Sequence, residues 1–349
     1  MTRRYTMILA AIAFFLGLQN PGFSQPTIGM SFPPVETPPK IAFTLKQLDL
    51  LQIQHIRFAE NWKNREPRRG QFNWRPLESR IAALAERGIK ILLTIQADGP
   101  DWACASRTSK LCTFRDWADM EPYLNQLLAR VGDKLDAIQF GNEWDHQFMG
   151  NAALYLDYQN RFYRLVKQAR PDLNVVLGGI TSRALLYETM CLDEKPLDTS
   201  AMQLTVDNDL GTFLQQQICV RNAAGYRADR ADVKMVLANA NYDIADLHLY
   251  DTPKLWADFV QIFRRLTPKP VYITEFGGPS PEFERADPQY QATRLATYLN
   301  AIKSLPVIRA YYFKLTDGGS AYHARSGLFD ANGNPKPALQ VFLNWQVGN

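Results

Sequence analysis

The chain alternates short apolar, β-rich runs with amphipathic segments, and this alternation constrains its fold more than any other feature. Eight runs are typical of strands: 27–32, 55–62, 89–95, 137–140, 174–180, 244–250, 271–275 and 309–315. Helical spacing is found at 44–51, 75–87, 117–131, 154–169, 254–266 and 289–302, and a last helix begins near Pro335. Strands that alternate with helices favour βαβ units, and eight such units predict an α/β fold, a closed (β/α)₈ TIM barrel.

A doubly wound open sheet is the alternative arrangement of these elements. No glycine-rich phosphate loop follows the first run, which argues against a dinucleotide-binding version. No composition break marks a linker in the 349 residues, so we expect one barrel domain over residues 25–349. Segment 181–241 is too long for a bare loop, and we expect it to form helices between strands five and six.

The first 24 residues are typical of a secretory signal peptide. Arg3 and Arg4 supply its positive region, 7–18 supply its apolar stretch, and small residues precede a cleavage site after Ser24. The apolar stretch is short for a membrane span, so an uncleaved anchor is the weaker interpretation. The sequence predicts a secreted or periplasmic protein with no membrane partner after signal cleavage.

The remaining part of the chain contains four cysteines: Cys104, Cys112, Cys191 and Cys219. In an exported protein an even count favours disulfides over buried thiols, and four cysteines allow three pairings. We favour the pairs 104–112 and 191–219, because each closes a loop between core elements. The cysteine spacing does not suit a zinc site and the four histidines are scattered, so we expect no metal and no cofactor.

The charge pattern gives no sign of a nucleic-acid partner. The net charge is +4, part of it in the expected signal peptide, and no basic stripe is present. Aromatic residues make up 12% of the chain, which suits sugar stacking and an ordinary aromatic core equally well.

Two of the expected strands lead to a glutamate. The run at 137–140 is followed by Asn142 and Glu143, and the run at 271–275 ends in Glu275. The carboxyl ends of barrel strands meet on one face, so the two side chains can converge there. Glycoside cleavage needs such a pair of carboxyl groups in different protonation states. Helix capping is the alternative for Asn142 and Glu143, and the second motif shifts the balance toward catalysis.

These motifs, at strands four and seven of eight, resemble those of the clan A glycoside hydrolases, which are retaining enzymes on (β/α)₈ barrels. Asn142-Glu143 and the tetrapeptide 274–277, Thr-Glu-Phe-Gly, match the clan's pattern. Segment 62–74 is similar to the loop after strand two in family 39, and segment 327–338 is similar to the clan's usual ending. The resemblance covers almost the whole mature chain.

The resemblance implies a role for each matching residue. Glu143 would be the acid/base and Glu275 the nucleophile. Asn142 would bind the sugar 2-hydroxyl. Arg57, which we place at the end of strand two, would keep the nucleophile ionised, because a nearby cation favours the charged form of a carboxylate. A purely structural salt bridge is the alternative for Arg57.

Further contacts are expected from strands six and eight. His248 and Tyr250 alternate with leucines, so both face the same way. If that way is the barrel mouth, Tyr250 could donate to Glu275 and His248 could contact the substrate; buried polar core residues are the alternative. The clan often ends strand eight with a tryptophan that floors the sugar subsite. This chain has none there, and Phe313 is the expected substitute.

Four tryptophans are further candidate platforms for a sugar ring: Trp62, Trp102, Trp117 and Trp144. A loop tryptophan is more often a packing anchor than a ligand contact, so Trp144, next to Glu143, is the strongest of them. We retain Trp62 and Trp144 as candidate substrate-binding residues.

The sequence therefore predicts a retaining glycosidase that cleaves β-glycosidic bonds of an oligo- or polysaccharide. A barrel that binds carbohydrate without turnover is the alternative, left open by the missing strand-eight tryptophan. An unrelated metal-dependent hydrolase is disfavoured by the lack of clustered ligands. Endo action follows if segments 98–115 and 181–241 flank an open groove, and exo action follows if they wall one end. Export favours the open groove.

Overall fold

The computed structural model describes residues 25–107, 112–192, 217–250, 253–277, 287–319 and 323–347. The expected signal peptide, residues 1–24, lies outside the described residues. Within these ranges, no helix combines the length and the apolar character that crossing a membrane requires.

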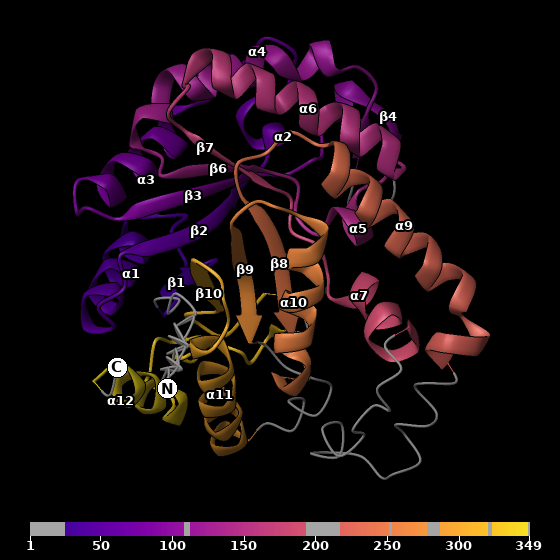
Figure 1. Cartoon of the computed structure of the whole chain (residues 1–349). Coiled ribbons are helices and arrows are strands. Elements are labelled where there is room, and N and C mark those ends of the chain that lie inside the picture. The colour runs from indigo at the N-terminus through magenta and orange to yellow at the C-terminus, as the bar shows by residue number, and fades with distance from the viewer. Residues whose placement is uncertain are drawn as a thin grey trace, which may run out of the picture.

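Eight parallel strands form the centre of the molecule: β1 (Thr27–Ser31), β2 (His55–Glu60), β3 (Lys90–Ile95), β6 (Ala137–Phe140), β7 (Asn174–Leu177), β8 (Ala245–Tyr250), β9 (Val271–Gly277) and β10 (Arg309–Phe313). Their order in the sheet is β7-β6-β3-β2-β1-β10-β9-β8. Parallel bridges from Val176 to Ile244 and from Ile180 to Leu247 then join β7 to β8. Helices surround these strands (Figure 1), so the predicted barrel is confirmed.

The barrel interior is filled in two layers. One layer is apolar and contains residues from both halves of the sheet: Leu92, Ala137, Val176, Ile244, Tyr272 and Tyr311. Because side chains alternate along a strand, the next inward positions toward the strand ends include Thr94, Gln139 and Asp246. These three side chains and Arg57 are fully buried. A buried polar layer of this kind must be hydrogen-bonded, and it lies directly beneath the strands' carboxyl ends.

The longer helices are α1 (Pro38–Leu50), α3 (Arg75–Ala85), α4 (Trp117–Val131), α6 (Ala152–Ala169), α9 (Ala223–Asn239), α10 (Trp256–Leu266), α11 (Pro288–Lys303) and α12 (Pro337–Val347). Short helices α2 (Trp62–Arg65), α5 (Trp144–Gln147) and α7 (Arg183–Tyr187) follow strand ends. Side-chain caps begin α4 at Asp116, α6 at Asn151 and α11 at Asp287.

The first helix begins earlier than its spacing indicated. Prolines occupy the first positions of α1, where a missing N–H costs nothing, so the helix starts at Pro38. Thr44 therefore lies inside the helix, and its hydroxyl donates to the carbonyl of Pro34 at 2.6 Å.

The two long connections contain more structure than bare loops. Segment 98–115 includes an antiparallel hairpin of β4 (Cys104–Arg107) and β5 (Cys112–Phe114). Segment 181–241 includes α7, α9 and two π-helical turns at Glu188–Leu192 and Gln217–Arg221. Disulfides join 104 to 112 and 191 to 219, with Cα atoms 5.5 and 5.6 Å apart. The predicted pairing and the predicted helices are confirmed.

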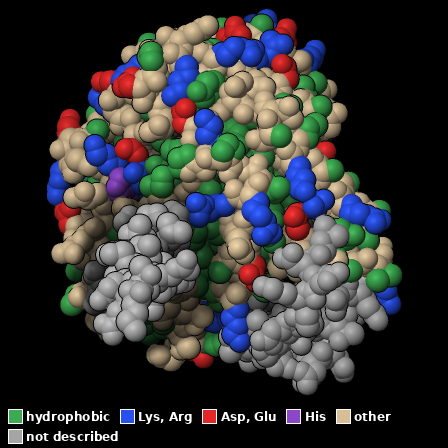
Figure 2. All heavy atoms as spheres, viewed as in Figure 1, with side chains coloured by type: hydrophobic (Ala, Val, Ile, Leu, Met, Phe, Trp, Pro, Cys, Tyr) green, Lys and Arg blue, Asp and Glu red, His purple; other side chains and the backbone are tan. Residues whose placement is uncertain are grey.

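The surface charge is mixed. On the face shown in Figure 2, Lys and Arg side chains are interspersed with Asp and Glu side chains. That face therefore presents no continuous stripe of one sign.

Candidate active site

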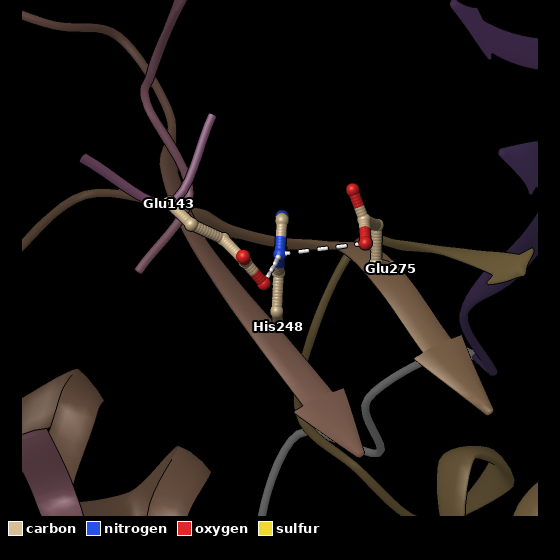
Figure 3. Close-up of side chains that lie close together, drawn as sticks. All are labelled: Glu143, His248 and Glu275. Carbon is tan, nitrogen blue, oxygen red and sulfur yellow. Dashed lines mark hydrogen bonds and ion pairs between the residues drawn. The ribbon is translucent and has the colours of Figure 1, made fainter. Parts of the chain in front are cut away.

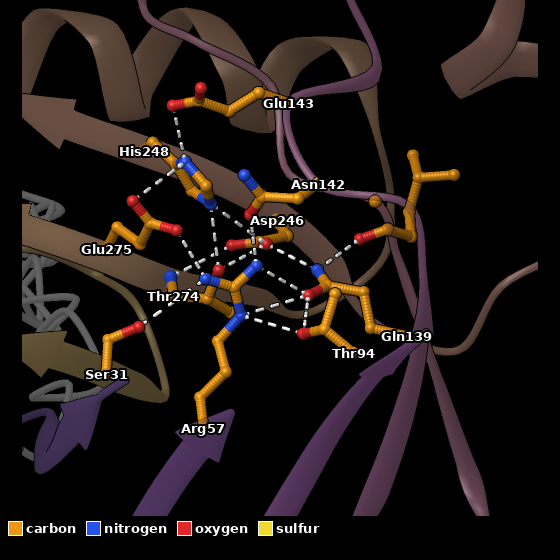
Figure 4. Close-up of polar contacts among 12 residues, drawn as sticks. Ser31, Arg57, Thr94, Gln139, Asn142, Glu143, Asp246, His248, Thr274 and Glu275 are labelled. Carbon is orange, nitrogen blue, oxygen red and sulfur yellow. Dashed lines mark hydrogen bonds and ion pairs between the residues drawn. The ribbon is translucent and has the colours of Figure 1, made fainter. Parts of the chain in front are cut away.

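The carboxyl ends of four barrel strands bring the predicted polar residues together (Figure 4). Arg57 is the third residue of β2 and not at its end as predicted, but its long side chain reaches the site, and Asn142 follows β6. His248 lies on β8 beside Glu275 on β9, and these two residues are register partners. The site is thus built on the barrel strands, directly above the buried polar layer.

The two glutamates face the same imidazole ring (Figure 3). Nδ1 of His248 lies 2.9 Å from Oε1 of Glu143 and 3.7 Å from Oε2 of Glu275. One oxygen of each glutamate and a ring nitrogen of His248 all lie within 4.8 Å of one another. The pair of carboxyl groups that the sequence predicted to converge does so.

Each oxygen of Glu275 receives a hydrogen bond. Nη1 of Arg57 forms an ion pair with Oε1 at 2.5 Å, and Arg57 is fully buried. The hydroxyl of Tyr250 donates to Oε2. Arg57 also donates from Nη2 to Oδ1 of Asn142 at 2.5 Å and to Oε1 of Gln139 at 2.9 Å. The guanidinium therefore fixes both the carboxylate and the amide at the barrel mouth.

Hydrogen bonding indicates that both nitrogens of His248 carry a proton. The hydroxyl of Thr274 donates to Oδ2 of Asp246 at 2.6 Å, so its single hydrogen is used there. It must then accept from Nε2 of His248, 3.0 Å away. Nδ1 faces two carboxylates, one of them that of Glu143. The imidazolium form of His248 satisfies all of these contacts, with Nε2–H donating to Thr274 and Nδ1–H to Glu143.

The electrostatics agree with this assignment. Burial acts to lower the pKa of His248, but the charge of Glu275 and hydrogen bonds to Asp246 and Glu143 outweigh it and raise that pKa to about 10. Burial acts to raise the pKa of Glu143, but the hydrogen bond and charge of His248 outweigh it and lower that pKa to about 2. At neutral pH these two side chains form an ion pair.

The same three side chains are the one grouping among the described residues whose ligand atoms could hold a metal ion. The scattered histidines had not suggested it. A doubly protonated imidazole offers no lone pair to a metal, so the geometry suits proton transfer better than metal binding.

Glu143 is held in an unusual backbone conformation. Its φ of 44° and ψ of 54° lie in the left-handed region, which costs a non-glycine residue energy. Gln147, one turn on in α5, donates from Nε2 to Oε2 of Glu143 at 2.6 Å. Sequence reasoning missed Gln147. Its spacing of four residues from the glutamate was the available signal.

A glycine on the neighbouring strand makes room for the site. A Cβ at Gly179 would lie 2.3 Å from Nε2 of His248 and 2.7 Å from Oδ2 of Asp246. No side chain fits there, so this close approach explains the glycine at position 179.

The prediction that Trp62 contacts the substrate is wrong. Trp62 is fully buried, stacks near Tyr123 at 6.1 Å and donates from Nε1 to Glu66 at 2.6 Å. The strand that was expected to reach it ends at Glu60, so Trp62 begins α2 and turns inward. It anchors the loop after β2.

Trp144 is also a packing residue. Only 5% of it is exposed, and its ring stacks on Tyr155 at 4.8 Å with an angle of 9° between the planes. The turn at Glu143 directs the indole into the helix layer, so the expected stacking of a sugar on it is not supported.

Phe313 lies at the end of β10 and is half-buried. Its ring meets Phe32 at 5.8 Å, His323 at 4.8 Å and Tyr250 at 6.3 Å. Phe32 and His323 were not predicted as site residues: Phe32 was expected inside the first strand but follows it, and His323 lies in a loop. The structure brings His323 within 5.0 Å of Tyr250, which binds Glu275.

The sequence and the fold both match glycoside hydrolases. A family model described as the glycosyl hydrolase catalytic core matches residues 220–342. No match was found among curated proteins. The match includes Glu275 but not Glu143.

Several solved structures share the fold. An exo-β-1,4-mannosidase from Opitutaceae bacterium strain TAV5 is 16% identical, with a TM-score of 0.65 over 93% of this chain and 59% of that one. A GH5_18 enzyme from Streptomyces cattleya, in complex with GlcNAc, is 14% identical, with a TM-score of 0.64 over 93% of this chain and 82% of that one. A family 39 glycoside hydrolase from Bacteroides cellulosilyticus WH2 is 16% identical, with a TM-score of 0.59 over 92% and 63%.

The chain thus spans 59% of the length of the mannosidase and 63% of the family 39 enzyme. At these identities the structural similarity shows the fold, and the family model adds a catalytic core that is found in its carboxyl-terminal part. Together they support the predicted resemblance to the clan A glycoside hydrolases in sequence over residues 220–342 and in fold over almost the whole chain.

Proposed function

We propose that this protein is a glycosidase that retains configuration at the anomeric carbon, with Glu275 as nucleophile and Glu143 as acid/base. The separation of the two carboxyl groups is the observation that carries the proposal, with one oxygen of each within 4.8 Å. Retaining enzymes place these groups about 5–5.5 Å apart, whereas inverting enzymes separate them by about 6.5–9.5 Å to admit a water molecule.

Glu275 suits the role of nucleophile because its charge is fixed in place. Arg57 and Tyr250 each donate to one of its oxygens, so the carboxylate is oriented before substrate arrives. In the first step one oxygen forms a bond to the anomeric carbon as the bond to the leaving oxygen breaks.

Glu143 must hold a proton when the leaving oxygen departs, yet in this structure it is paired with a charged His248. The 2.9 Å hydrogen bond offers a route: the proton on Nδ1 passes to Glu143 and from there to the leaving oxygen. Covalent attachment removes the charge of Glu275, the largest influence that raises the pKa of His248. Loss of the histidine proton is therefore favoured in the same step.

The second step reverses these changes. Glu143, again ionised, takes a proton from water as the oxygen of that water attacks the anomeric carbon and releases Glu275. The proton returns to His248 as the negative charge of Glu275 reappears. Asn142, held by Arg57, is placed to bind the sugar 2-hydroxyl, where contacts strengthen in the transition state.

The proposed substrate is a β-linked oligo- or polysaccharide, and Phe313 is the proposed floor of the subsite. The names of the similar structures favour β-linked sugars, since one is a β-1,4-mannosidase and another was solved with Manβ1-4GlcNAc. We propose export as well, with cleavage after Ser24, because two disulfides suit an oxidising compartment.

Azide rescue tests the two roles separately. With an activated aryl β-glycoside, Glu143→Ala in azide should yield the β-glycosyl azide, and Glu275→Ala should yield the α-glycosyl azide. Each variant should lose at least about 1000-fold in kcat without azide on a substrate with a poor leaving group. Swapped products would reverse the roles. Binding of sugars with no turnover by the wild type would favour the carbohydrate-binding alternative, and activity lost to a chelator would favour a metal-dependent hydrolase.

A further inference from the structure

Four rings stand in contact on one side of the proposed nucleophile. Phe313 meets Phe32 and His323, and His323 meets Tyr250 at 5.0 Å. Tyr250 donates to Glu275, so this aromatic wall borders the carboxylate itself. Phe32 has a φ of 47°, a left-handed conformation that is rare for a bulky residue, and this turn at the end of β1 is what brings its ring to the wall.

The loop that carries His323 is pinned to the barrel. Tyr312 on β10 donates to the carbonyl of Ser326 at 2.9 Å, and the N–H of Ser326 donates to the carbonyl of His323 at 3.3 Å. Asp317 forms an ion pair with Lys336, with Oδ1 and Nζ 2.9 Å apart. His323 is thus placed by a tied loop against a rigid strand, as a ligand-contacting residue needs to be.

His323 differs from His248 in charge. Burial lowers the pKa of His323 below its usual value, and Lys314 adds to this while Glu275 opposes it. A neutral imidazole carries one N–H donor and one nitrogen acceptor, and a sugar hydroxyl can pair with either. A phenylalanine floor offers neither, and an indole offers only a donor.

The charges around the wall suit a neutral sugar. Arg57 and His248 are already paired with carboxylates, and Lys314 donates to the carbonyl of Gly318. A sugar carboxylate at this place would face the carboxylates of Glu275 and Glu143. Each of the three cations just named already has a partner, so like-charge repulsion disfavours an acidic sugar.

We propose that His323 determines specificity by binding one hydroxyl group of a neutral sugar that Phe313 supports beside Glu275. This rests on the proposed function. It assigns to a loop histidine the recognition of a hydroxyl group on the sugar that is cleaved.

Two variants separate hydrogen bonding from packing. His323→Phe keeps an aromatic ring against Phe313 and Tyr250 but removes both polar atoms, and His323→Asn restores a donor and an acceptor. The substrates are 4-nitrophenyl β-D-glucopyranoside and β-D-mannopyranoside with their 3-, 4- and 6-deoxy derivatives. Thermal unfolding confirms that each variant is folded.

We expect His323→Phe to lower kcat/KM about fivefold to tenfold on the parent glycoside, as for one lost hydrogen bond. The loss should vanish on one of the monodeoxy substrates, and His323→Asn should recover part of it. An equal loss on every substrate, or no loss on the parent, would overturn the inference while leaving the glycosidase intact. A wild type that cleaves neither glycoside and yields no azide product from either glutamate variant would overturn the proposed function and the inference with it.

Discussion

The buried ion pair between His248 and Glu143 predicts a dependence of stability on pH. The pKa of His248 is about 10 in the folded protein against a usual 6.5, so the folded state binds the proton more tightly than the unfolded chain. The stabilisation is fully present below pH 6.5 and is lost as pH rises toward 10. The pKa of Glu143 is lowered to about 2 in the folded protein. Its ionised form therefore stabilises the fold fully above pH 4.5, the usual pKa, and this stabilisation is lost as pH falls toward 2.

The size of this pH effect on stability follows from the pH range between the usual pKa of His248, 6.5, and its pKa in the folded protein, about 10. Each pH unit within it changes the unfolding free energy by about 1.4 kcal/mol, so the whole effect is about 5 kcal/mol. The two shifts share the contact between His248 and Glu143, so they are not added together. Between pH 7 and pH 9 alone, the contribution of His248 should fall by about 3 kcal/mol.

Urea unfolding of the wild type and His248→Gln at pH 7, 8 and 9 measures this contribution. The difference in unfolding free energy between the two should shrink by about 3 kcal/mol from pH 7 to pH 9, because glutamine does not titrate. His146→Gln, at an exposed histidine of α5, is the matched control and should show no such trend. A difference that stays constant across this range would refute the charged state of His248 and, with it, the proposed proton route.

Further perturbations test the parts around this pair. Arg57→Lys keeps the charge but not the two-sided hydrogen bonding to Glu275 and its neighbours, so we expect kcat/KM to fall about 100-fold and the unfolding free energy to fall by about 3 kcal/mol; wild-type kinetics would contradict this account. Gln147→Ala removes a hydrogen bond that lowers the pKa of Glu143, and Glu143 must hold a proton in the first step, so the basic limb of the kcat/KM profile should move to higher pH; an unchanged limb would count against the contact. Replacing the hairpin disulfide with serines should cost about 2.5 kcal/mol and replacing the other about 3.6 kcal/mol, as loop lengths of 8 and 28 residues imply; equal urea midpoints with and without either bridge would contradict this.

The barrel and the centre of the site could be predicted because both follow from periodicity. Alternating runs specify the parallel strands, and a glutamate directly after a strand must lie at the carboxyl end of the barrel. The alternation of His248 and Tyr250 with leucines likewise places both side chains inward, where they meet Glu275. Such positions are set by the strand itself and need no knowledge of the loops.

Loop residues depend on contacts that spacing does not encode. Trp62 and Trp144 lie within a few residues of strand ends, as Glu143 does, yet both side chains turn into the helix layer. Burial of the large apolar indole there stabilises the fold. Phe32 reaches the aromatic wall through a left-handed backbone turn, and His323 through a loop tied to β10. A left-handed φ is rare for phenylalanine, and the position of His323 depends on the hydrogen bond between Tyr312 and Ser326, so residue spacing predicts neither.

Trapping the covalent intermediate tests the central claim most directly. The purified protein is incubated with aryl 2-fluoro-β-glycosides carrying activated leaving groups, and intact mass and peptide mapping follow. The account predicts one glycosyl adduct per chain, on Glu275, and no adduct in Glu275→Gln. An adduct on Glu143 or on any other residue would contradict the assignment of the nucleophile, and rapid turnover of the parent glycosides with an inverted product would contradict the retaining mechanism.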